Sequence, residues 1–243
     1  KSMLTYTYVS EGTFALMEKP KPVLQHERDA IVKVTLASIC SSDLHIKHGS
    51  VPRAVPGITV GHEMVGIVEE VGSAVTNVKP GDRVTVEELL YGLLLCSGND
   101  AALALADHCG GLERFVAEMN RKAAELGMTG TSFANPNGLD QEGHYSTARD
   151  MARLAACAVK NETLVRLCST RSVTVGGRTM TNHNRLLRSI DGCIGLKTGY
   201  TRAAGRTLVS CVRRNGRTLV AVTLQDGNDW ADHKTLYEMG FAA

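Results

Sequence analysis

The chain has 243 residues, of which 43% are hydrophobic and 21% charged, a composition typical of globular rather than disordered or fibrous proteins. This length suits one large domain or two of about 100–150 residues each. The net charge of +2 indicates no general attraction to nucleic acid or to an anionic membrane. No apolar run approaches the roughly 20 residues that span a bilayer, so we expect no membrane segment.

The first 86 residues are predicted to be rich in short β-strands. Apolar and polar residues alternate over 32–36, the period-two pattern of a half-buried strand. Further β segments are expected at 64–71 and 83–86, and turns containing Gly and Pro separate them. Many short strands with such turns indicate a small barrel.

After Glu87 the pattern becomes helical. Apolar residues recur at i, i+3, i+4 and i+7 spacing over 112–126, and Gly127 supplies a stop. Thr147, with Asp150 three residues later, is a plausible start for another helix.

The C-terminal region is predicted to end in a β-hairpin and a closing helix. The β-rich runs 207–212 and 217–224 are joined through Asn215-Gly216, which accepts the positive φ angles of a type I′ turn. Residues 230–239 can form the helix. The second part is therefore expected to be α+β, with helices first and an antiparallel sheet after them.

Cys40, His62 and Glu63 form the first chemical constellation. A cysteine thiolate and a neutral imidazole are ligands that Zn²⁺ prefers. Here residues 3–86 resemble the GroES-like substrate domain of the zinc-dependent medium-chain alcohol dehydrogenases. The stretches that carry this resemblance are 18–22, 40–45, 61–63, 65–72 and 79–84.

The resemblance implies an all-β GroES-like barrel over 1–86, with Cys40 and His62 as zinc ligands and Glu63 as a ligand or its neighbour. A further ligand of that family has no matching position here. No two glycines are spaced G-x-G, so the dinucleotide fingerprint is absent and we expect no NAD. The alternative is an empty metal site in which Cys40 and His62 are ordinary core residues.

Ser97-Gly98-Asn99 and Lys197-Thr198-Gly199 form the second constellation. The first triplet opens a helix of small residues, and the second precedes the predicted hairpin. Either triplet alone is weak, but together and in this order they are much more specific. A lysine and a hydroxyl on a strand edge can hold a substrate carboxylate. A facing serine and asparagine can pass protons and orient the acyl group.

Residues 87–243 resemble the serine-type D-alanyl-D-alanine carboxypeptidases, the low-molecular-mass penicillin-binding proteins. The resemblance implies a β-lactamase/transpeptidase-like α+β fold and a D-alanyl peptide or a β-lactam as ligand. It also implies a site at the cell envelope. The catalytic positions that it implies are Ser97, Asn99, Lys197, Thr198 and Gly199.

One part of that family's pattern is absent. Its nucleophile lies in an S-x-x-K motif, and no serine in this sequence is followed by lysine three residues later. The family's first strands and nucleophile helix would stand where the dehydrogenase-like part is. An unactivated hydroxyl is a poor nucleophile, so we expect recognition with little turnover, and whether the chain is an enzyme stays open.

The two resemblances together predict a chimera of two incomplete catalytic domains, 1–86 and 87–243. The alternatives are a zinc-binding module and a chimera without function. Each part lacks core partners, so apolar surface is expected to drive self-association. Location stays open: the seven cysteines, never spaced C-x-x-C, and the lack of a signal peptide favour the cytoplasm, whereas the peptidase part favours the envelope.

Overall fold

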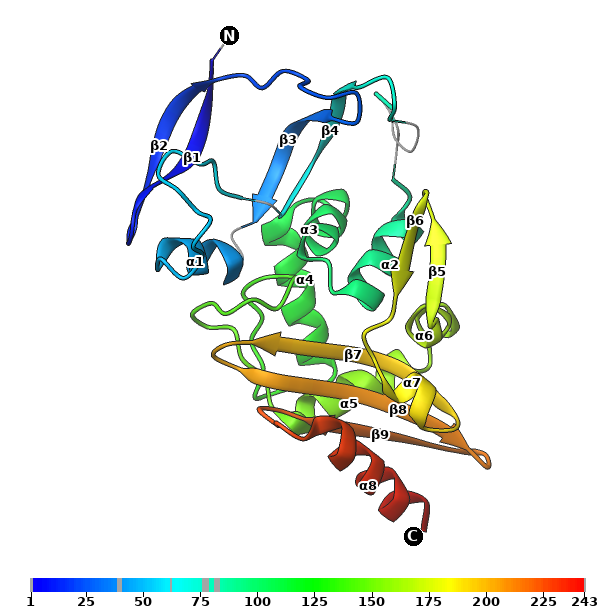
Figure 1. The fold of residues 1–243 in the computed structure, drawn as a ribbon. Helices are drawn as coiled ribbons and strands as arrows, with labels where there is room; N and C mark the ends of the chain where they lie inside the picture. The colour runs from blue at the N-terminus through cyan, green and yellow to red at the C-terminus, as the bar shows by residue number, and fades with distance from the viewer. Residues whose placement is uncertain (1, 39–40, 62, 76–78, 81–83, 243) are drawn as a thin grey trace. The chain divides into compact units, whose positions relative to one another are not determined.

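The computed structural model describes residues 2–38, 41–61, 63–75, 79–80 and 84–242 (Figure 1). The chain divides into two compact units, Lys1–Val84 and Thr85–Ala243, and each is considered by itself. No helix in the described part of the chain is both long enough and apolar enough to cross a membrane.

The first unit contains two separate two-stranded antiparallel sheets. Strand β1 (Ser2–Ser10) pairs with β2 (Thr13–Pro20), and β3 (Ala30–Ser38) pairs with β4 (Glu63–Val71). Helix α1 (Ser41–Lys47) follows β3 in the sequence. The strands expected at 32–36 and 64–71 are therefore confirmed as parts of β3 and β4.

The predicted all-β GroES-like barrel is wrong, because the described strands of this unit pair only two by two and close no barrel. Large apolar side chains of both sheets face solvent instead of a common interior: Leu4 and Leu16 are each 66% exposed, and Ile67 is 56% exposed. Alternating apolar residues and turn residues indicate where strands form, but they look the same in an isolated hairpin and in a barrel. A barrel closes only if strands far apart in the sequence pair with each other, and the sequence pattern carries no information on that pairing.

The second unit opens with helix α2 (Val86–Cys96), so the strand predicted at 83–86 is wrong over its described residues. Thr85 and Glu88 form a capping box. The Glu88 amide donates to Thr85 Oγ1 at 3.2 Å, and the Thr85 amide donates to Glu88 Oε2 at 2.7 Å. These bonds satisfy two amides of the first turn, and they outweigh the β propensity of Val84-Thr85-Val86.

Six more helices lie among the described residues of this unit. The helix predicted over 112–126 is confirmed, and so is the start at Thr147, whose hydroxyl accepts from the Asp150 amide at 3.2 Å. The closing helix is also confirmed, although it begins one residue earlier than expected. The bounds are α3 (Asn99–His108), α4 (Leu112–Glu125), α5 (Ala148–Ala158), α6 (Glu162–Ser169), α7 (Leu186–Ser189) and α8 (Asp229–Ala242).

A three-stranded antiparallel sheet carries the second motif. Its strands are β7 (Cys193–Thr201), β8 (Gly205–Arg214) and β9 (Arg217–Thr223), in that order. Asn215 (φ 52°) and Gly216 (φ 72°) form the turn between β8 and β9, which confirms the predicted hairpin. A second, smaller hairpin pairs β5 (Ser172–Val175) with β6 (Arg178–Thr181).

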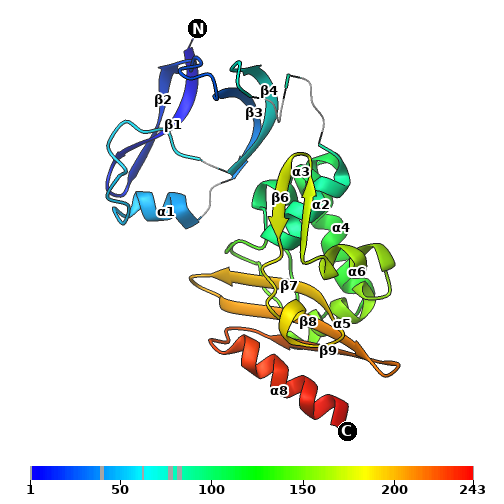
Figure 2. The same ribbon diagram turned by 45° about the vertical axis from the view of Figure 1, so that its right-hand side comes forward.

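Helices cover both faces of the three-stranded sheet. Helix α8 lies along one face and α5 lies on the other (Figures 1 and 2). Strand β8 is the centre of this core: its Leu208, Cys211 and Val212 have no exposed surface. In the described sheet β7 is an edge strand, so a rigid support holds Lys197-Thr198-Gly199 at an open edge.

Candidate active site

Ser97 lies in the sharp turn that joins α2 to α3. It is the C-cap of α2 and has a left-handed backbone (φ 57°, ψ 39°), while Gly98 caps the start of α3. The left-handed conformation costs a residue with a Cβ about 1 kcal/mol relative to a right-handed one, so the local preference of serine does not explain this backbone. The turn places Ser97 in the lining of a cavity.

Lys197, on β7, lies against Ser97 although 100 residues separate them in the sequence. Its Nζ donates to Ser97 Oγ and also to the Thr198 carbonyl oxygen, the latter at 2.7 Å. The β7–β8 pairing is irregular between Cys193 and Gly195, and Leu196 has a positive φ of 89°. The strand is therefore irregular immediately before the lysine that reaches Ser97.

Burial lowers the pKa of Lys197 to about 8, and the thiols of Cys168 and Cys96 oppose this shift only in part. Burial also raises the pKa of the Cys168 thiol to about 11, which keeps it protonated at neutral pH. With a pKa of about 8, roughly a tenth of Lys197 is a neutral amine at pH 7. A neutral amine hydrogen-bonded to a hydroxyl can accept its proton.

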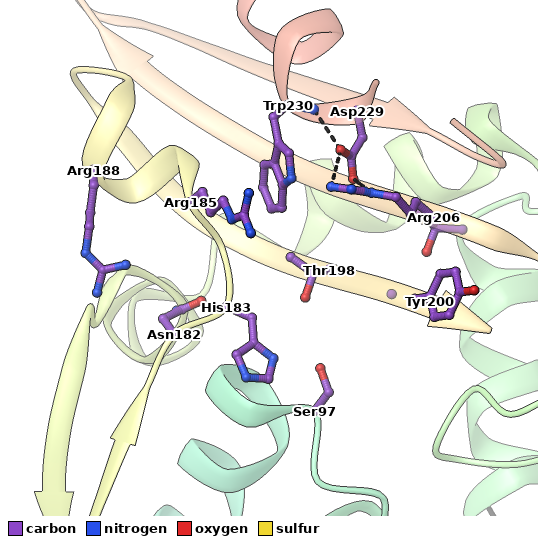
Figure 3. A pocket seen from close by; sticks show the side chains of 12 residues that line it. Ser97, Asn182, His183, Arg185, Arg188, Thr198, Tyr200, Arg206, Asp229 and Trp230 are labelled. Atoms are coloured by element: carbon purple, nitrogen blue, oxygen red, sulfur yellow. Dashed lines mark hydrogen bonds and ion pairs between the residues drawn. The ribbon is translucent and has the colours of Figure 1, made fainter. Parts of the chain in front are cut away.

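Gly199 leaves space for the Thr207 side chain beside the motif. It pairs with Thr207, and a Cβ placed on Gly199 would lie 2.4 Å from Thr207 Oγ1. Any side chain at this position would therefore require the Thr207 side chain to move. The side chain of Thr198, one residue earlier, lies at the cavity next to the site (Figure 3).

A cavity of about 760 Å³ opens beside Ser97. Of the five predicted catalytic positions, Ser97, Thr198 and Gly199 line it, and Lys197 joins them through its bond to Ser97. Asn99 begins α3 and is not among the lining residues of the described chain. The structure thus brings together four of the five residues. The other lining residues are Asn182, His183, Arg185, Arg188, Tyr200, Arg206, Thr207, Asp229 and Trp230.

Arg206, Asp229 and Trp230 are site residues that the sequence did not reveal. Arg206 donates to both carboxylate oxygens of Asp229, from Nε at 3.1 Å and from Nη2 at 2.7 Å. Its guanidinium carbon also lies 5.7 Å from the centre of the Trp230 ring. The only available signal was that Trp230 is the single tryptophan of the chain.

The structure does not describe the predicted zinc site. Cys40 and His62 lie outside the described residues, and of Glu63 only its place at the start of β4 is described. Within the described ranges no three His, Cys, Asp or Glu side chains are grouped so that they could hold a metal ion. The zinc site stays a prediction.

Comparison with known proteins identifies the family. Residues 47–228 match peptidase S11, the D-alanyl-D-alanine carboxypeptidase family. The chain belongs to this family. The match starts well before the boundary expected at 86/87, so part of the dehydrogenase-like stretch falls inside it. The alcohol dehydrogenase resemblance of the preceding residues stays a prediction.

Two curated relatives illustrate the similarity. D-alanyl-D-alanine carboxypeptidase DacF of Bacillus subtilis is 41% identical over 150 residues, which are 59% of this chain and 39% of the relative. DacB2 of Mycobacterium tuberculosis is 41% identical over 177 residues, 68% of this chain and 61% of the relative. The chain thus spans only part of the length of these peptidases.

Solved structures of penicillin-binding proteins share the fold. The Streptomyces K15 DD-transpeptidase has a TM-score of 0.64 at 35% identity, covering 68% of this chain and 71% of that one. A penicillin-binding protein homologue from Mycobacterium tuberculosis has a TM-score of 0.63 at 39% identity, over 71% and 70%. Penicillin-binding protein D2 of Listeria monocytogenes, in a cefotaxime-bound form, has 0.61 at 34%, over 65% and 67%. These matches also count against the predicted GroES-like barrel.

Proposed function

We propose that this chain binds D-alanyl peptide ends and β-lactams in the cavity beside Ser97. The bound ligand slowly acylates Ser97, and the resulting ester is hydrolysed only to a small extent. The observation that carries the proposal is the hydrogen bond from Lys197 to Ser97. It joins the two motifs at one edge of the cavity. Membership of the carboxypeptidase family and the cefotaxime-bound relative support the choice of ligand.

The cavity suits a ligand that ends in a carboxylate. The Thr198 hydroxyl and the Arg206 guanidinium both line it, and hydrogen bonds between a guanidinium and a carboxylate are among the strong ones in proteins. Asp229 fixes the orientation of Arg206 through two hydrogen bonds. If the ligand carboxylate bound between Thr198 and Arg206, the neighbouring carbonyl group of the ligand would face Ser97.

The acyl step needs a proton acceptor for Ser97, and Lys197 is the candidate. The neutral Lys197 amine takes the hydroxyl proton while Ser97 Oγ bonds to the carbonyl carbon. The C–N bond of the ligand then breaks, and its nitrogen receives that proton from Lys197. The product is an ester on Ser97, and water must hydrolyse it to complete a turnover.

Slow chemistry follows from what the sequence lacks. No S-x-x-K motif is present, so Lys197 would have to serve both as base and as part of the ligand site. Only about a tenth of it is neutral at pH 7. We therefore expect stoichiometric labelling over minutes to hours rather than rapid hydrolysis.

Covalent labelling with a fluorescent penicillin tests the proposal. The intact chain should gain one adduct by mass spectrometry, located on Ser97. Ser97→Ala and Lys197→Arg should abolish it, whereas Ser172→Ala, which removes an exposed hydroxyl on β5, should not change it. Absence of any adduct at millimolar ligand, or an adduct that survives Ser97→Ala, would refute the proposal.

The first unit carries a separate proposal, a zinc site made by Cys40, His62 and Glu63. It is supported by the ligand chemistry of these residue types. Metal analysis of the purified chain tests it: bound zinc should be lost in Cys40→Ala and in His62→Ala. Zinc absent from the unaltered protein would refute the site and would leave the dehydrogenase resemblance without a chemical role.

Three further expectations can be checked directly. The chimeric origin would be refuted if the encoding DNA and the intact mass did not agree on one continuous chain. Self-association would be refuted by a monomeric mass in sedimentation equilibrium. Because the proposed D-alanyl peptide ligand belongs to the cell wall, we propose an envelope location, which fractionation of the source cells would test.

A further inference from the structure

The cavity beside Ser97 carries more positive charge than one carboxylate needs. Three arginines line it, Arg185, Arg188 and Arg206, against one acidic residue, Asp229. Three positive charges and one negative charge leave two positive charges in the lining. A ligand with a single carboxylate would neutralise only one of them.

The charge of Arg206 is balanced within the protein. Its Nε and Nη2 donate to Asp229, whose side chain is only 4% exposed. Asp229 also accepts from the Trp230 amide at 2.8 Å, so the carboxylate is held in place. The excess positive charge therefore belongs to the two remaining arginines.

Arg185 is positioned without being neutralised. Its guanidinium carbon lies 5.9 Å from the centre of the Trp230 ring, a cation–π distance that restricts the side chain and uses none of its N–H donors. Figure 3 shows the guanidinium groups of Arg185 and Arg206 on either side of this ring. In the described part of the chain the side chains of Arg185 and Arg188 form no ion pair or hydrogen bond.

We infer that Arg185 forms a second anion subsite, so that ligands with two carboxylates bind more tightly than ligands with one. The inference rests on the proposed function for the position of the first carboxylate, at Thr198 and Arg206. A planar guanidinium with unused donors binds a carboxylate through two parallel hydrogen bonds. Because Arg185 is exposed, we expect a preference of about fivefold rather than hundreds.

The fluorescence of Trp230 allows the preference for two carboxylates to be measured without any acylation of Ser97. It is the only tryptophan, and it lies between the two arginines, so its fluorescence should report anions that enter the cavity. Glutarate and pentanoate have five carbons each and differ by one carboxylate. We would titrate both into the intact chain at low ionic strength, where screening is weak. The rise in unfolding temperature with each ligand gives a second reading.

The inference predicts that glutarate binds about fivefold more tightly than pentanoate, and that Arg185→Gln brings the ratio close to one. Arg149→Gln removes the same charge from an exposed position on α5 and should leave the ratio unchanged. Equal affinities, no binding of either acid, or a ratio that survives Arg185→Gln would overturn the subsite. Failure of penicillin labelling with this preference intact would refute the proposed acylation and leave the subsite standing.

Discussion

The assignment of Lys197 as the base for Ser97 predicts a specific pH dependence of penicillin labelling. Only the neutral amine accepts a proton, so the labelling rate should follow the neutral fraction of Lys197. Burial lowers the pKa of this residue to about 8. The rate should therefore rise through neutral pH and level off well below the ordinary titration range of lysine.

The size of the effect follows from that pKa. The neutral fraction is about 9% at pH 7, about 50% at pH 8 and about 90% at pH 9, so the rate should rise about tenfold over two pH units and then stop rising. An ordinary exposed lysine has a pKa of about 10.4. Its neutral fraction would rise about a hundredfold over the same interval, with no plateau by pH 9.

The assay is the rate of adduct formation on Ser97 at saturating fluorescent penicillin, from pH 6 to 10. Lys197→Arg keeps a positive charge that does not titrate here, and it should abolish labelling at every pH in this range. Lys234→Arg changes an exposed lysine of α8 and should reproduce the original profile. Circular dichroism at each pH checks that the chain stays folded. A rate that keeps rising tenfold per pH unit beyond pH 9 would refute Lys197 as the base.

Three predictions concern the support of the site. Gly199→Ala should lower the free energy of unfolding in urea by about 1–3 kcal/mol, because the new Cβ would clash with the Thr207 side chain. Adding Thr207→Ala should recover part of this loss, and no recovery would contradict the clash. Asp229→Asn should lower the free energy of unfolding by about 1–2 kcal/mol, a modest loss because Arg206 is partly exposed. It should also weaken ligand binding, because Arg206 loses the charged partner that orients it. Unchanged stability would contradict the role of this ion pair. His233 is a fully buried residue of α8, and burial lowers its pKa. Its contribution to stability is therefore full above about pH 6.5 and is lost as the pH falls toward the folded pKa. His233→Gln should reduce the difference between the free energies of unfolding at pH 7.5 and at pH 5.5.

Features with a local cause could be predicted from the sequence. The turn at Asn215-Gly216 needs only positive φ angles at two adjacent residues, and the helix start at Thr147 needs only one side-chain bond. These two predictions use information within a few residues of each feature. The meeting of Ser97 with Lys197, 100 residues apart, was expected instead from the resemblance to the carboxypeptidases, which relates the two triplets.

Features that depend on distant pairing could not be predicted in this way. The strands predicted within 30–71 are present in the first unit, but its described strands do not close into a barrel. At 85–88 two local signals competed: Val84 and Val86 favour a strand, while Thr85 with Glu88 favours a helix start. The capping box prevails because it satisfies backbone amides that the first helical turn would otherwise leave without partners.

The same distinction applies to the chemistry of the site. Arg185, Arg206 and Trp230 come from three separate segments, and no spacing in the sequence relates them. The absence of S-x-x-K suggested that Ser97 has no base, because a motif records residue types and not their surroundings. A lysine becomes a base at neutral pH through burial, which only the packing around β7 supplies to Lys197. Labelling alone would therefore show that Ser97 reacts, whereas the position of the pH plateau tests whether β7 provides the missing proton acceptor.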